Sequence, residues 1–284
     1  MKNLINLSFY KYISIIYVKE FRNILYIYFS KLNIHGRIYI SNEGINAQIS
    51  IYKKNFFKFK KILNLFFNNI YLNKSIDTKR SFSCLNIKIK KKILSDGFIN
   101  YFKKEKNLSL SIQAVNIMLK KNIIIIDMRN KYEYDIGHFN KAFIIPSFTF
   151  REQLKKIVHF FCYAKNDPIL IYCTGGIRCE RASLFMKNYG YKKIYQIKGG
   201  IIKYVYDAKK KNLPMLFQGK NFVFDERISE LNTKIIKSTC RQCYFICDYY
   251  VNCKNVFCNK LFIQCFKCFI KFNGCCSLYC KNQI

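Results

Sequence analysis

The stretch PILIYCTGGIRCERASLFMKNYG, residues 168–190, decides the fold of the central part of this chain. It begins as a short apolar run, reaches Cys173, passes two glycines and continues into a helical pattern that stops at Tyr189-Gly190. A fully apolar run is typical of a parallel strand that is covered on both faces. The stretch therefore predicts a strand–loop–helix unit of an α/β domain, with a cysteine at the carboxyl end of the strand.

The loop after this strand has the composition of a reactive cysteine site. Ligands of open α/β sheets bind beyond the carboxyl ends of the strands, and we expect the two glycines to take positive φ and to turn amide N–H groups inward. Such amides, a helix N-terminus and a guanidinium can lower a cysteine pKa from about 8.5 to ~4–7. A buried structural cysteine is the alternative, and the two glycines and the arginine argue against it. We predict the catalytic residues Cys173 and Arg178, and the active-site loop Thr174, Gly175, Gly176 and Ile177.

The length of this loop limits the size of the group that it can bind. Four residues separate Cys173 from Arg178, whereas cysteine phosphatases use a loop that is one residue longer and holds a tetrahedral phosphate. The shorter loop suits a smaller group, such as the sulfur of a persulfide. Cys179 lies in the first turn of the predicted helix, where it either resolves an oxidised Cys173 or packs as a small side chain. Arg181 either contacts phosphate or lies on a solvated helix face.

Four units follow from the pattern along the chain. Residues 1–92 alternate as β-α-β-β-α-β, with FSCLNIKIK as the fourth strand, which is the order of a ferredoxin-like α+β sandwich. Residues 93–108 form a polar connector. Residues 109–220 contain the apolar strands NIIIIDMR, AFIIP, PILIYC and KIYQI, and the segments REQLKKIVHFFCY and RCERASLFMKNYG are predicted helices between the last three, which indicates a parallel-sheet domain. Residues 221–284 form a tail that is rich in cysteine.

Charge and hydropathy limit the partners and the compartment. The formal net charge is +34, and residues 1–92 carry 18 Lys and Arg against 3 Asp and Glu. This excess favours a polyanion such as nucleic acid, although the richness in Lys, Asn, Ile, Phe and Tyr without Trp is also typical of an AT-rich genome. It argues against a strongly basic partner. We find no run of 18 apolar residues and no signal-peptide pattern, so we expect no membrane span and a cytoplasmic protein.

The cysteines predict metal sites. Ten of the fourteen cysteines lie between Cys240 and Cys280, and a dense cluster in a chain without a signal peptide indicates metal ligands in a reducing cytosol. Two C-x2-C pairs have the spacing of metal knuckles. Eight thiolates suit two structural zinc ions, and an iron–sulfur cluster is the alternative. The predicted ligands are Cys240, Cys243, Cys253, Cys258, Cys265, Cys268, Cys280 and one of Cys275 and Cys276, preferably Cys276, with Cys247 left over.

The histidines argue against a redox metal in the central domain. A non-haem iron site needs two histidines and one carboxylate. The chain has only His35, His138 and His159, which fall in separate parts of the predicted fold. We expect no iron or flavin site.

A family resemblance rests on several motifs. The stretch IDMRNKYEYDIGHFNKAFIIP resembles the rhodanese signature, and a C-x-x-G-x-R loop follows it. The stretches GRIYISNEGINAQIS, YCTGGIRCERAS, YQIKGGIIKY and FVFDERI, with the cysteine tail, resemble a bacterial family of rhodanese-domain proteins, the tRNA uridine hydroxylases, over about residues 8–280. The signature residues are Asp127, Arg129, Glu133, Tyr134, Gly137, His138, Ala142 and Pro146.

This resemblance implies a function. It implies oxygen-dependent conversion of the wobble uridine of tRNA to 5-hydroxyuridine, with tRNA as partner, molecular oxygen as co-substrate and Cys173 as the active-site cysteine. The cysteine acts as a C6 nucleophile, as a persulfide or as an oxidised sulfur. A rhodanese-type sulfurtransferase carrying a cysteine persulfide is the alternative function, and a binding module that only uses the fold is a third.

Overall fold

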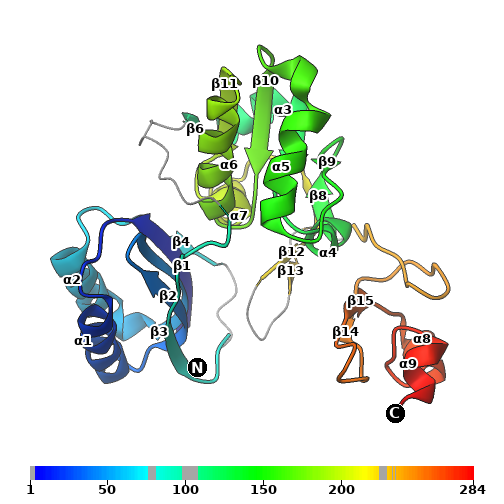
Figure 1. The fold of residues 1–284 in the computed structure, drawn as a ribbon, viewed down its shortest axis with the longest axis horizontal. Helices are drawn as coiled ribbons and strands as arrows, with labels where there is room; N and C mark the ends of the chain where they lie inside the picture. The colour runs from blue at the N-terminus through cyan, green and yellow to red at the C-terminus, as the bar shows by residue number, and fades with distance from the viewer. Residues whose placement is uncertain (1–3, 76–80, 98–107, 224–228, 232, 234) are drawn as a thin grey trace.

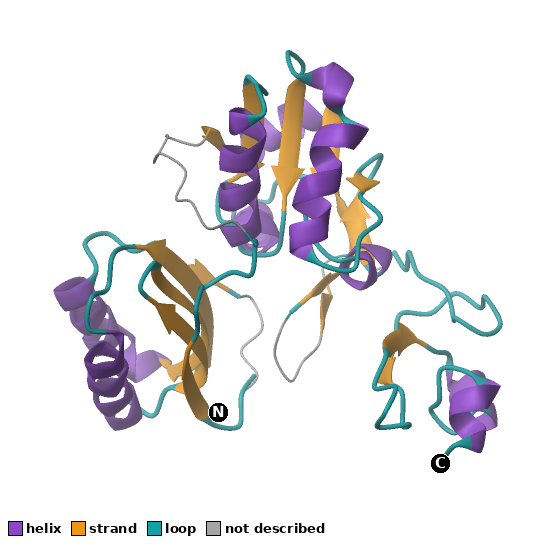
Figure 2. Cartoon of the chain, viewed as in Figure 1, coloured by secondary structure: helices purple, strands orange, loops and turns teal. Residues whose placement is uncertain are grey.

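A computed structural model describes residues 4–75, 81–97, 108–223, 229–231, 233 and 235–284 (Figure 1 and Figure 2). Most of the predicted connector, residues 98–107, and the end of the FVFDERI stretch, residues 224–228, lie outside the described residues. Within the described part of the chain, no helix is both long and apolar enough to cross a membrane.

The N-terminal unit has the predicted ferredoxin-like order of elements, with one addition. A short strand, β4, pairs with β1, and the strand predicted from FSCLNIKIK, β5, pairs parallel to β2 at the opposite edge, so that the sheet order is β4-β1-β3-β2-β5. The sequence predicted β5 but not β4, which is only two residues long. The elements are β1 (Leu4–Tyr12), α1 (Val18–Lys31), β2 (His35–Ser41), β3 (Gly44–Tyr52), η1 (Lys53–Asn55), α2 (Phe56–Phe66), β4 (Asn73–Lys74) and β5 (Leu85–Ile89).

The two faces of this sheet have different roles. Side chains alternate between the faces along each strand. Ile38, Ile40 and Ala47 point into a core with helices α1 and α2, which cover one face (Figure 1). Their neighbours Arg37 and Tyr39 line a cavity on the other face. The alternation therefore leaves a polar face available to the central domain.

The central unit is a parallel sheet with helices on both faces, as predicted. The strand order is β6-β11-β10-β7-β9, with α5 and α6 packed on one face and α3 and α7 on the other (Figure 2). Along β10, Ile169, Ile171 and Cys173 face the first layer, while Leu170 and Tyr172 face the second. The elements are β6 (Leu108–Leu110), α3 (Ile112–Leu119), β7 (Ile124–Asp127), α4 (Lys131–Asp135), β8 (Gly137–Phe139), β9 (Phe143–Ile144), α5 (Phe150–Phe160), η2 (Cys162–Ala164), β10 (Pro168–Tyr172), α6 (Ile177–Asn188), β11 (Lys193–Ile197) and α7 (Gly200–Lys210).

Three helices of this unit were not predicted. Helices α3 and α4 are short, and α7 begins at Gly199-Gly200, a pair that local propensity assigns to a turn. Both glycines have positive φ, +70° and +67°. Tertiary packing therefore decides where α7 begins.

The cysteine-rich tail is attached to the central unit through α4. Strand β12 pairs with β8 and β13, and Tyr250 and Phe222 pack against Tyr132 of α4. The Tyr250 hydroxyl donates to the Tyr132 carbonyl oxygen. The remaining elements are β12 (Phe217–Phe222), β13 (Ser229–Leu231), β14 (Tyr250–Asn252), β15 (Leu261–Ile263), α8 (Phe266–Lys271) and α9 (Leu278–Asn282).

Contacts between the N-terminal and central units converge on the loop after β10. The Asn73 amide donates to the Gly175 carbonyl oxygen at 3.2 Å, and the Tyr10 hydroxyl donates to Glu180 at 2.8 Å. The predictions for Arg181 are both wrong: it is buried, binds Asp96 of the connector at 2.5 Å and lies over the ring of Tyr12. The N-terminal unit is thereby fixed against the cysteine loop.

Candidate active site

The cysteine loop lies at the carboxyl end of β10, as the sequence predicts. Gly176 has φ +101° and precedes α6, so it needs the conformational freedom of glycine. The expectation for Gly175 is wrong, because its φ is not positive and a Cβ there would meet nothing closer than 3.9 Å. Only one of the two glycines is therefore required by the turn itself.

Helix α7 supports the loop from behind. The backbone amides of Ile201 and Ile202 donate to the carbonyl oxygens of Cys173 and Thr174, at 3.0 and 3.1 Å. A Cβ on Gly200 would lie 2.5 Å from the Thr174 carbonyl oxygen, so glycine permits this close approach. The two glycines of the YQIKGG stretch make this contact possible, but their role in supporting the loop was not predicted.

The surroundings of Cys173 favour its thiolate. Cys173 has no exposed surface, and burial raises its pKa, but hydrogen bonds from the Cys179 thiol and from backbone amides and the charge of Arg178 outweigh burial and lower the pKa to about 6. The Gly176 N–H lies 3.1 Å from the sulfur. At neutral pH the sulfur is therefore ionised.

Cys179 lies beside Cys173 in the first turn of α6 and is also buried. Burial and the neighbouring Cys173 sulfur raise the pKa of the Cys179 thiol well above its usual value. The two cysteines thus differ in protonation, with Cys179 as the donor and Cys173 as the acceptor of their hydrogen bond.

Arg178 is held by a carboxylate to which the sequence analysis assigned no role. Its guanidinium forms two hydrogen bonds with Glu133, of 2.7 and 2.8 Å, and a third of 3.2 Å with the Thr174 hydroxyl. Burial raises the pKa of Glu133, but Arg178 outweighs that effect and keeps it below its usual value. Glu133 also accepts the N–H of Asn130, which closes a capping box on α4. The rhodanese signature contains Glu133, so a signal for it was present.

A second buried ion pair supports the end of β7. Arg129 binds Asp127 through two nitrogens and donates to the Gly137 carbonyl oxygen at 2.5 Å. The Gln153 amide of α5 donates to the carbonyl oxygens of both ion-pair residues. These signature residues therefore fix the strand end beside the cysteine loop.

A cavity of about 590 Å³ lies between the N-terminal sheet and the cysteine loop. We name it the front cavity. Cys173, Thr174 and Arg178 form part of its wall, and the strands β1, β2 and β3 supply the opposite side. None of the described residues that line it carries a carboxylate, while four are cationic: Arg37, Lys90, Lys92 and Arg178. The front cavity therefore suits an anionic ligand with polar groups.

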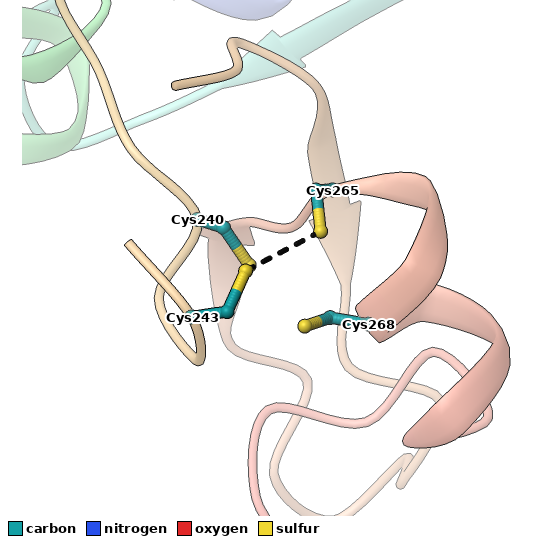
Figure 3. A group of neighbouring side chains, drawn as sticks. All are labelled: Cys240, Cys243, Cys265 and Cys268. Carbon is teal, nitrogen blue, oxygen red and sulfur yellow. Dashed lines mark hydrogen bonds between the residues drawn. The ribbon is translucent and has the colours of Figure 1, made fainter. Parts of the chain in front are cut away.

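The tail cysteines form two groups of four, which the sequence could not assign. The sulfur atoms of each group lie within 4.8 Å of one another, with Cys243 and Cys265 at 3.6 Å and Cys258 and Cys276 at 3.7 Å. Figure 3 shows the first group, whose four side chains come from two separate chain segments and point toward a common centre. Tetrahedral zinc–thiolate bonds of about 2.3 Å place sulfurs roughly 3.8 Å apart. The groups are Cys240, Cys243, Cys265 and Cys268, and Cys253, Cys258, Cys276 and Cys280.

Two tail cysteines remain outside these groups. Cys247 is outside both groups, and Cys275 is outside while Cys276 is inside. Both groups could hold a metal ion.

Comparisons with known proteins agree with this architecture. The UPF0176 acylphosphatase like domain matches residues 4–93, the rhodanese-like domain matches residues 112–206, and the rhodanase C-terminal model matches residues 218–281. The fold and the loop thus define a rhodanese-domain protein with an acylphosphatase-like N-terminal domain.

Whole-chain relatives define the family more closely. The tRNA uridine(34) hydroxylase of Buchnera aphidicola subsp. Acyrthosiphon pisum (strain Tuc7) is 52% identical over 98% of this chain and 88% of that protein. The one from Buchnera aphidicola subsp. Baizongia pistaciae is 52% identical over 99% and 92%, and the one from Escherichia fergusonii is 46% identical over 98% and 81%. The chain belongs to the tRNA uridine(34) hydroxylase family, which confirms the predicted resemblance.

The Glu133–Arg178 pair generates a prediction about stability. Replacing Glu133 with Gln leaves Arg178 buried without its carboxylate, which we expect to cost about 3 kcal/mol of unfolding free energy or more at pH 7. Because the pKa of Glu133 is lowered on folding, the pair stabilises the fold above the unfolded pKa and this contribution is lost as the pH falls below about 4.3. Urea unfolding at several pH values measures this difference.

A matched control for this variant is Asp135→Asn on the same short helix. Asp135 pairs with Lys131 on the surface, so we expect a change within about 0.5 kcal/mol. Equal effects of the two variants would contradict the role given to Glu133.

Proposed function

We propose that this protein hydroxylates uridine 34 of tRNA to 5-hydroxyuridine through Cys173, with molecular oxygen as co-substrate. One observation carries the proposal: a buried sulfur with a pKa of about 6 lies in the wall of a cationic cavity in a member of this family. It rests also on the names of the relatives, each a tRNA uridine(34) hydroxylase.

The chemistry we propose begins with the thiolate. The Cys173 sulfur adds to C6 of the uracil ring, which makes C5 electron-rich. C5 then bonds to molecular oxygen and forms a hydroperoxide, and two thiols of a cellular reductant, oxidised to a disulfide, convert it to the C5 hydroxyl and water. Loss of the C5 proton finally expels the Cys173 thiolate from C6 and restores the ring double bond. Arg178 and the Gly176 amide hold the sulfur ionised before it attacks. Since Cys173 has no exposed surface, side chains of the front cavity must shift when the base enters.

Binding of tRNA is supported by the wall opposite the cysteine. Arg37 and Lys90 lie on the polar side of the front cavity and can contact phosphates, while Lys92 pairs with Asp96 at 2.7 Å. Glu43, in the turn between β2 and β3, is buried and accepts the N–H of Ile93 at 2.9 Å, so it is not free to contact RNA. We therefore assign RNA contact to the sheet face and the β5 edge, not to that turn.

The tail is proposed to hold two structural zinc ions, one for each group of four thiolates. The observed sulfur spacing suits tetrahedral zinc, and the first group joins the segment before β14 to α8. Bound metal supplies folding free energy that so small a unit lacks. We also propose the unit boundaries 1–92, 93–108, 109–220 and 221–284, and a cytoplasmic location where tRNA is available.

The proposed activity predicts the effect of cysteine variants. We express each variant in cells that lack the gene. The Cys173→Ser variant should yield about 100-fold less 5-hydroxyuridine than the native chain, because the nucleophile is lost. Cys162→Ser, an exposed cysteine of the same domain, is the control and should restore it fully. Mass spectrometry of nucleosides from tRNA measures the product.

Other outcomes of this experiment have distinct meanings. Loss of thiolated uridine in the gene-deleted cells would assign the sulfurtransferase function instead. No change in any modified uridine would indicate a binding module.

The two thiolate groups predict a metal content. We expect two zinc ions for each chain, and about one after Cys265→Ser or Cys258→Ser, because each variant removes a ligand from one group. Cys247→Ser and Cys275→Ser, which change thiols outside the groups, should keep both ions. Elemental analysis of the purified protein measures this, and iron in place of zinc, with visible absorption, would contradict the assignment.

A further inference from the structure

A second cavity, of about 350 Å³, lies on the other side of the cysteine loop. We name it the rear cavity. Tyr10, Asn73 and Gly175 line both cavities, so the two are neighbours separated by the loop and by β1. The chemistry proposed above uses only the front cavity.

The rear cavity contains buried polar atoms that lack a partner among the described residues. They are the Asn73 Oδ1, the Gln196 Oε1 and the Tyr12 hydroxyl. Asn73 and Gln196 are only 3% and 8% exposed. An unpartnered buried polar atom costs free energy, so two amide oxygens and one hydroxyl beside a cavity indicate a ligand that forms hydrogen bonds. The two amide oxygens can only accept, so the ligand must donate to them.

The two amide groups have fixed orientations. The Asn73 nitrogen donates to the Gly175 carbonyl oxygen at 3.2 Å, and the Gln196 nitrogen donates to the Ser109 hydroxyl at 3.0 Å. In each residue the nitrogen is occupied and the oxygen is left to accept. The Glu180 carboxylate, which accepts from Tyr10, adds to the acceptor character of the wall.

The other lining residues indicate a planar ligand with an anionic neighbour. The rings of Tyr10, Tyr12 and Tyr71 line the rear cavity, together with Lys11 and the exposed Lys198. Aromatic rings stack on nucleobases, and lysines bind the phosphates between them. An ammonium ligand would match the acceptors and the rings, but the lysines would repel it.

We propose that the rear cavity binds the nucleobase next to the target uridine and reads its N–H donors through Asn73 and Gln196. This inference rests on the proposed function, because it places two consecutive nucleotides on either side of the loop. The target base enters the front cavity, and its neighbour stacks in the rear cavity. Of the natural bases, those with an exocyclic amino group present donors to both amide oxygens.

Binding of anticodon stem-loop RNAs to the full-length protein tests this inference. The probes carry either adenosine or purine riboside, which lacks the amino group, on the 5′ side or on the 3′ side of the target uridine. We expect the protein to bind the adenosine RNA about 3- to 10-fold more tightly on one of the two sides. Fluorescence anisotropy measures the dissociation constants.

Variants separate recognition from folding. Gln196→Met should abolish the preference, and Ser109→Ala, which removes the hydroxyl that orients the Gln196 amide, should weaken it. Tyr12→Phe removes only an unpartnered hydroxyl, so it should weaken RNA binding without lowering the unfolding temperature.

Each result bears on the inference in a defined way. Equal binding of both RNAs by the native chain, or a preserved preference in a folded Gln196→Met protein, would overturn it while RNA hydroxylation continued. Failure of the native chain to bind either RNA would overturn the proposed function as well.

Discussion

The ion pair between Glu133 and Arg178 is the constraint on which the reactive loop depends. It joins α4 to the first turn of α6 across 45 residues of sequence, and Thr174 completes it. A buried pair gives little net stability compared with an apolar contact, but it specifies one arrangement of its partners. Here that arrangement places a guanidinium near Cys173, and the resulting field helps to keep the sulfur ionised.

The site is completed only by the N-terminal domain. The loop supplies the sulfur, while the polar face of the N-terminal sheet supplies the opposite wall and most of its cations. Arg181 and Asp96 join the two units, and Asn73 binds the loop directly. The same contacts divide the space around the loop into front and rear cavities. In the proposed function, the N-terminal domain thus supplies the part of the cavity that accepts the nucleotide.

The sequence predicted those features that depend on local pattern. Apolar runs located β7, β10 and β11, and the CTGGIR stretch located the loop that carries Cys173. Features that depend on long-range packing were not predicted. Helix α7 begins at two glycines, and the partner of Arg181 lies 85 residues away. The spacing of ten cysteines permits many pairings, so only their positions in space show which four lie together. Glu133 belongs to the rhodanese signature, but its role depends on its ion pair with Arg178, which lies 45 residues further along the chain.

The central claim is that Cys173 is a thiolate at neutral pH, and its direct test is an ultraviolet titration. Thiolates absorb near 240 nm, so the absorbance of the native chain minus that of Cys173→Ser, followed against pH, isolates this sulfur from the other cysteines. The account predicts that the difference appears with a midpoint at about pH 6. A midpoint near that of an ordinary cysteine, about 8.5, would contradict it.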